Sequence, residues 1–74
     1  MQNYTIKVKH HRFLNKEQAD SLSKYGIKVI LNNHVYDEYS AHMPTKIDLD
    51  QETVDSILKS FKSTIQENII TIEI

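Results

Sequence analysis

An apolar stripe with helical spacing, followed at once by a short β-branched run, constrains the fold of this chain most strongly. Within residues 50–65 the apolar positions recur every three or four residues, as on one face of an amphipathic helix: Val54, Ile57, Leu58, Phe61 and Ile65. Asp50 stands where an N-cap belongs, with Glu52 in the first turn. Residues 68–74, NIITIEI, are too short and too β-branched for a second helix and predict a strand. A helix that leads into a strand needs a sheet to lie on, so the rest of the chain is expected to supply one.

The N-terminal part of the chain predicts a strand, a helix and a second strand. Residues 4–9 alternate apolar and polar side chains, as a half-buried strand does. Asn15 and Gln18 form a capping-box pattern for a helix over 16–24, and Gly26 follows where a left-handed C-terminal residue belongs. Residues 27–31, IKVIL, predict the second strand.

The next segment predicts a hairpin. Asn32-Asn33 is a plausible two-residue turn into a third strand over about 34–40, which would place Leu31 opposite His34 and Lys28 opposite Asp37. A loop is the alternative for 34–40, because Glu38 would otherwise share a face with core residues. Met43-Pro44 then breaks regular structure before the next helix begins.

The resulting order of elements is β-α-β-β-α-β. Two βα units joined by a hairpin, with right-handed crossovers, predict an α+β fold of the ferredoxin-like sandwich type. We expect one domain over residues 1–74, with a four-stranded antiparallel sheet, strands one and three at its centre, and two helices on one face.

Composition narrows the functional classes. The chain has 74 residues and no cysteine, which excludes disulfides and thiolate metal sites and predicts a cytoplasmic protein. No apolar run reaches the length of a membrane span, and no signal peptide is evident, so we expect no membrane partner. The net charge of −1 is unevenly spread, with residues 1–12 basic and residues 32–55 acidic. Such opposite poles suit a complementary protein surface better than a polyanion.

Motifs for catalysis and for ligand binding are missing. Gly26 is the only glycine, so there is no phosphate-binding loop, and no serine or histidine lies in a hydrolase pattern. His10 and His11 are expected to approach His34, with His42 at the opposite edge, but no carboxylate at ligand spacing supports a metal site. The acidic residues near 48–55 are explained by the helix N-terminus. We therefore expect no enzyme, no cofactor and no metal.

Binding to another protein is the function that remains. The expected contact residues form an aromatic and acidic segment: Tyr36, Asp37, Glu38, Tyr39 and Met43. Tyr39 would lie on the face of the sheet away from the helices. The alternative that Tyr36 belongs to the core and the other residues are merely solvated stays open.

The same composition fits an inhibitor from a phage or mobile element that docks on a host protein. Exposed Ile30, Val35 and Ile69 on the sheet face would predict a homodimer.

Nucleic-acid binding is the alternative function. It would use the basic residues Lys7, Lys9, Arg12 and Lys28 on the sheet face. The aromatic and basic signature of an RNA-recognition strand is absent, since residues 34–42 read HVYDEYSAH. Nucleic acid is therefore the less favoured partner.

Overall fold

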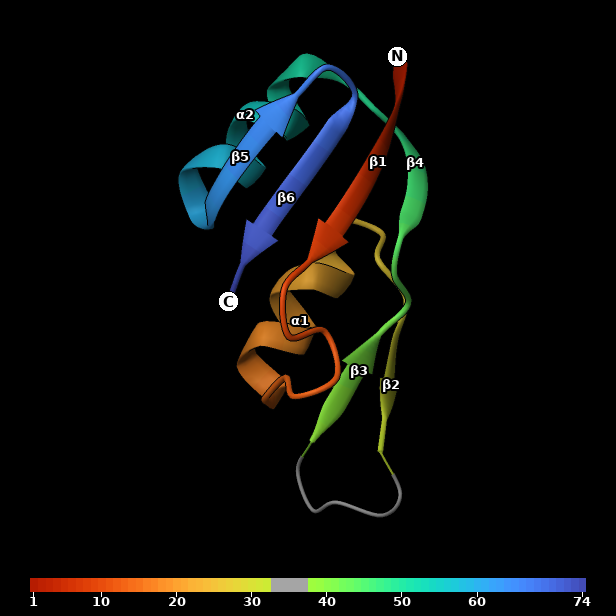
Figure 1. The fold of residues 1–74 in the computed structure, drawn as a ribbon, viewed down its shortest axis with the longest axis vertical. Helices are drawn as coiled ribbons and strands as arrows, with labels where there is room; N and C mark the ends of the chain where they lie inside the picture. The colour runs from red at the N-terminus through yellow and green to blue at the C-terminus, as the bar shows by residue number, and fades with distance from the viewer. Residues whose placement is uncertain (33–37) are drawn as a thin grey trace.

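Strand β1 (Gln2–Val8) occupies the middle of the larger sheet (Figure 1). The computed structural model describes residues 1–32 and 38–74. β1 pairs antiparallel with β4 (Thr45–Leu49) and parallel with β6 (Ile69–Glu73). β6 in turn pairs antiparallel with β5 (Lys62–Gln66), so the sheet is mixed and has the order β4-β1-β6-β5.

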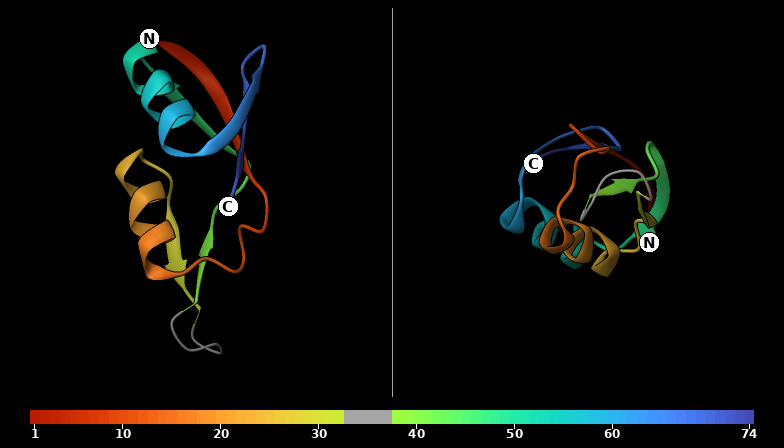
Figure 2. Two further views of the ribbon diagram at one scale, coloured as in Figure 1. Left: turned by 90° about the vertical axis from the view of Figure 1, so that its left-hand side faces the viewer. Right: turned by 90° about the horizontal axis from the view of Figure 1, so that it is seen from below.

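A second, two-stranded sheet lies towards one end of the molecule. It consists of β2 (Val29–Leu31) and β3 (Tyr39–Ala41), which run antiparallel. Helix α1 (Lys16–Lys24) packs on this small sheet, and helix α2 (Gln51–Ser60) packs against β5. Figure 2 shows both helices on one side of the molecule and the strands on the other. The molecule is elongated, with extents of 37 × 19 × 18 Å.

The helix ends follow the local sequence signals. The Asn15 side chain accepts a hydrogen bond from the Gln18 backbone N–H at 2.8 Å, and the Gln18 side chain accepts one from the Asn15 N–H at 3.0 Å. This is the predicted capping box, and α1 has the predicted bounds. Asp50 caps α2 by accepting from the Thr53 N–H at 2.8 Å. Gly26 follows α1 with φ of +89°, as predicted for a left-handed C-terminal residue.

One hydrophobic core joins the two sheets. Its fully buried side chains come from β1, β6, both helices and the segments that flank α1: Ile6, Leu14, Leu22, Ile27, Val54, Ile57, Ile70 and Ile72. In the described ranges no polar or charged residue is buried, so the core needs no internal ion pair. Neither helix is long or apolar enough to cross a bilayer.

The α+β class is confirmed, but the ferredoxin-like arrangement is wrong. The sheet is mixed because β1 and β6 run parallel, and the expected second and third strands form a sheet of their own. Residues 62–66, predicted as helix, form β5 because each residue of that segment finds a partner on β6. Residues 45–49, predicted as a lead into α2, form β4 along β1.

The predicted hairpin register is also wrong. Leu31 lies opposite Tyr39, and Ile30 lies opposite Ser40, instead of His34 and Val35. The expected pairing of Lys28 with Asp37 is replaced by one with His42, whose N–H donates to the Lys28 carbonyl at 2.9 Å. The predicted turn at Asn32-Asn33 lies partly outside the described residues.

Candidate functional site

The predicted partner-binding residues do not form one exposed surface. Tyr39 and Met43 are half-buried and pack against the hydrophobic core, so the expectation that Tyr39 lies on the face away from the helices is wrong. Glu38 is half-buried beside Asn32, whose N–H donates to the Glu38 carbonyl at 2.8 Å. Tyr36 and Asp37 lie outside the described residues. The strand opposite this segment, β2, is the more accessible part of the hairpin.

β2 has one paired edge and one open edge. The hydrogen bonds from the His42 N–H to the Lys28 carbonyl and from the Asn32 N–H to the Glu38 carbonyl show which backbone groups of this strand point towards β3. Because bonded residues alternate along an antiparallel pair, Ile30 also faces β3, whereas the N–H and C=O groups of Val29 and Leu31 point away from it. Within residues 1–32 and 38–74, no other strand pairs with that outer edge. The edge of β3 that faces away from β2 is not open, since its backbone groups bond to residues 11–14.

Exposed apolar side chains lie at the same place. Ile30 is 56% exposed and Leu31 is 49% exposed. Phe13, which is 69% exposed, belongs to the segment along the other side of β3, where Leu14 exchanges two hydrogen bonds with Tyr39. Alternation along β2 places Ile30 on the outer face of the small sheet and Leu31 on the face towards α1. Leu31 shares that face with Tyr39 and the buried Leu14. We call Phe13, Ile30, Leu31 and the open edge of β2 the hairpin surface.

A polar brace holds the hairpin surface in shape. The Asn32 side chain accepts a hydrogen bond from the Ser40 hydroxyl at 2.9 Å and donates one to the Arg12 carbonyl at 3.3 Å. It therefore joins β2, β3 and the segment before Leu14 across one face. This bracing fixes the register of β2 before any partner arrives, which reduces the ordering cost of binding.

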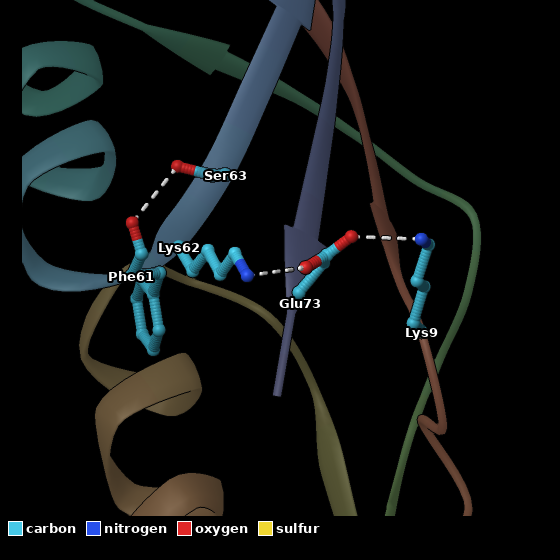
Figure 3. Close-up of polar contacts among 5 residues, drawn as sticks. All are labelled: Lys9, Phe61, Lys62, Ser63 and Glu73. Carbon is cyan, nitrogen blue, oxygen red and sulfur yellow. Dashed lines mark hydrogen bonds and ion pairs between the residues drawn. The ribbon is translucent and has the colours of Figure 1, made fainter.

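The predicted basic residues are divided between the two sheets. Lys7 lies on the open face of the larger sheet, whereas Arg12 and Lys28 belong to the region of the smaller one. Lys9 is paired, since its Nζ lies 2.8 Å from Oε1 of Glu73, and the other carboxylate oxygen of Glu73 lies 3.7 Å from Nζ of Lys62 (Figure 3). Lys9 and Lys62 together lower the pKa of Glu73, mainly through the hydrogen bond from Lys9. The four predicted residues thus do not form a single basic surface.

The open face of the larger sheet is mainly polar. Register places threonines and lysines on it, and Ile69 is its exposed large apolar residue. Ile30, which was expected to share this face with Ile69, lies on the smaller sheet, and Val35 lies outside the described residues. The expected apolar patch across one sheet face is therefore not formed by Ile30 and Ile69.

A surface groove of about 370 Å³ lies beside α1. Gln18 and Ser21 line one side of it, and Phe61, Lys62 and Glu73 line the other. Of its two side-chain carboxylates, that of Glu73 is engaged by Lys9 and Lys62, and no histidine of the described ranges lines the groove beside its two serines. Among the described residues, no three metal-ligating side chains lie together.

The histidines are also arranged differently from the prediction. The carbonyl of His11 accepts a hydrogen bond from the Ala41 N–H, so His11 lies beside the start of the His42 segment and not at the opposite edge. His34 lies outside the described residues.

No protein family, curated protein or solved structure matches the chain. The functional inference therefore depends on the geometry of the hairpin surface. Residues 27–31 indicated a strand in the sequence, but nothing in them indicates that its outer edge is open.

Proposed function

We propose that this chain is a non-catalytic protein-binding module that receives an extended segment of a protein along the open edge of β2. The outward backbone groups of Val29 and Leu31 carry this proposal. An added strand would satisfy those groups, and the side chains of Ile30 and Leu31 would supply apolar contact on its two faces. The same hairpin contains Glu38, one of the residues expected from the sequence to contact a partner.

The other sheet edges are less suited to this role. β4 carries Lys46 and Asp48, and β5 begins with Lys62, which is bound to Glu73. Charged side chains on an edge strand oppose pairing with another chain. β2 consists of Val29, Ile30 and Leu31 and lacks such protection.

A capture experiment with two matched variants tests the proposal. The tagged chain is incubated with a nuclease-treated lysate of bacteria that also express the untagged wild-type chain, in parallel with the tagged variants Ile30→Lys and Ile65→Lys. Ile65 is 42% exposed on the edge strand β5, so the control makes the same chemical change at a similar place. We expect a stoichiometric protein to be retained by the wild type and by Ile65→Lys and lost from Ile30→Lys, with equal melting temperatures for all three.

Equal capture by all three proteins would refute the hairpin surface as the contact site. Capture that disappears with nuclease and falls steeply as salt rises would instead support the nucleic-acid alternative, because phosphate contacts release counterions. Lys7→Ala, on the open face of the larger sheet, would then be the variant that weakens binding.

A further inference from the structure

We propose that the segment received by β2 is β2 of a second copy of this chain, which forms a symmetric antiparallel dimer. This inference rests on the proposed function, since it names the occupant of the hairpin surface. In the dimer the two small sheets join edge to edge. β2 lies towards one end of the long axis, so the two larger sheets would lie at opposite ends of the joined structure (Figure 1).

The hydrogen-bond pattern of β2 is self-complementary. In an antiparallel pair, residues whose backbone groups point away from β3 must lie opposite residues of the second copy whose backbone groups also point away from β3; we call these residues outward-facing. With Ile30 opposite Ile30 of the second copy, Val29 lies opposite Leu31, and both are outward-facing. Each Val29–Leu31 pair then exchanges two hydrogen bonds, and the complete three-residue strand is used. Shifting the register by two residues in either direction would pair only part of β2.

The side chains match in the same register. The two Ile30 side chains meet across the symmetry axis on the outer face, where each is 56% exposed in the single chain. Ile30 forms a non-hydrogen-bonded pair, in which side chains approach most closely. Leu31 meets Val29 on the face towards α1, so each exposed Leu31 gains an apolar neighbour.

The charges are also compatible with self-pairing. Lys28 lies opposite Asn32 of the second copy, so no like charges face each other. Glu38 lies beside Asn32 within each chain, because the Asn32 N–H donates to its carbonyl. Lys28 of one copy, Asn32 of the second copy and Glu38 of the second copy therefore follow one another across the joined sheet. Two strand spacings separate the backbones of Lys28 and Glu38 by about 10 Å, a distance that two long side chains can span. Symmetry gives the dimer two such Lys28–Glu38 rows.

Sedimentation analysis over a concentration series is the first test. An interface formed by two three-residue strands is small, so we expect weak association, and the series runs from about 1 μM to about 1 mM. We expect the wild type and Ile65→Lys to show a monomer–dimer equilibrium and Ile30→Lys to remain monomeric, since two lysines would face each other on the axis. Lys28→Glu is expected to weaken the dimer about tenfold, and addition of Glu38→Lys to restore it.

Cross-linking tests the register itself. The chain has no cysteine, so a single introduced cysteine reports one position. Opposed residues of a non-hydrogen-bonded pair have Cα atoms about 4.5 Å apart, within disulfide range. Ile30→Cys is therefore expected to form an intermolecular disulfide on mild oxidation, whereas His42→Cys, opposite Lys28 and one strand further from the axis, is not.

A wild type that remains monomeric throughout the series would overturn the dimer, as would a dimer that survives Ile30→Lys or cross-links equally through His42→Cys. If the wild type is monomeric and yet captures a different protein in a manner that depends on Ile30, the proposed function stands and only the identity of the partner is wrong.

Discussion

At the scale of single residues, Gly26 occupies a position that few other residue types can take. Its φ of +89° is one that side-chain-bearing residues rarely adopt. A Cβ atom there would also lie 2.7 Å from Cδ1 of Ile47 on β4. The glycine thus ends α1 and at the same time allows the chain to pass close to the larger sheet.

Gly26→Ala is expected to lower the free energy of unfolding by about 1–2 kcal/mol from the backbone strain alone. The contact with Ile47 adds a steric cost, which Ile47→Val should relieve because it removes Cδ1. Urea denaturation of the two single variants and the double variant measures both parts. Strictly additive effects of the two substitutions would contradict the proposed contact.

At the scale of elements, Glu73 joins three strands. It lies on β6 and contacts Lys9, just after β1, and Lys62 at the start of β5 (Figure 3). The pKa of Glu73 is lowered in the folded protein, chiefly by the hydrogen bond from Lys9. A carboxyl group with a lowered folded pKa stabilises the fold above its unfolded pKa, and this stabilisation is lost as the pH falls through the folded value.

Glu73→Gln is therefore expected to show a smaller loss of stability on acidification than the wild type, over the range below the ordinary glutamate value of 4.5. Thermal unfolding at a series of pH values measures the difference. Glu67→Gln, in the turn before β6, is the control. High salt should reduce the effect, because the pair is exposed. An unchanged pH profile in Glu73→Gln would contradict the role of the ion pair.

Elements with local signals were predictable from the sequence, and those defined by distant partners were not. Asn15, Gln18 and Gly26 mark the ends of α1 through contacts between near neighbours. β5 has no such signal, because Phe61 and Ile65 continue the helical spacing of α2 and only pairing with β6 makes the segment a strand. Its turn uses Glu67 at φ of +55°, where a glycine would have been the recognisable signal.

The candidate site was predictable only in part. The sequence indicated the hairpin but assigned the contact to Tyr39 and Met43, which pack against the core. Residues 27–31 contain the exposed Ile30, but its position on a second sheet depends on a register that the sequence did not reveal. The open edge of β2 is a property of the topology and has no local sequence signal.

At the scale of the whole molecule, one core holds both sheets together. Leu22 of α1 and Ile57 of α2 belong to the same buried cluster, and Tyr25 contacts Phe61 with ring centroids 5.9 Å apart in an edge-to-face arrangement. The smaller sheet alone has too few strands to be stable in water. The chain should therefore unfold as one cooperative unit.

Leu22→Ala is expected to cost about 2–5 kcal/mol, because Leu22 is fully buried. Hydrogen exchange followed by mass spectrometry should show faster exchange in β1 and β6 as well as in β2 and β3. Lys24→Ala, on the exposed side of α1, is the control. Protection of β1 and β6 that stays at the wild-type level in Leu22→Ala would show that the two sheets unfold separately.

The parallel pairing of β1 with β6 sets the order in which the chain can acquire its structure during translation. β1 is synthesised first and needs β6 on one side, yet Thr5 pairs with Ile69 and Val8 with Ile72. The centre of the larger sheet therefore cannot close until β6 has left the ribosome. Contacts between such distant residues slow folding, and until then β1 exposes Ile6 and Val8 to the surroundings. The late arrival of β6 thus lengthens the time during which apolar side chains of β1 can take part in aggregation.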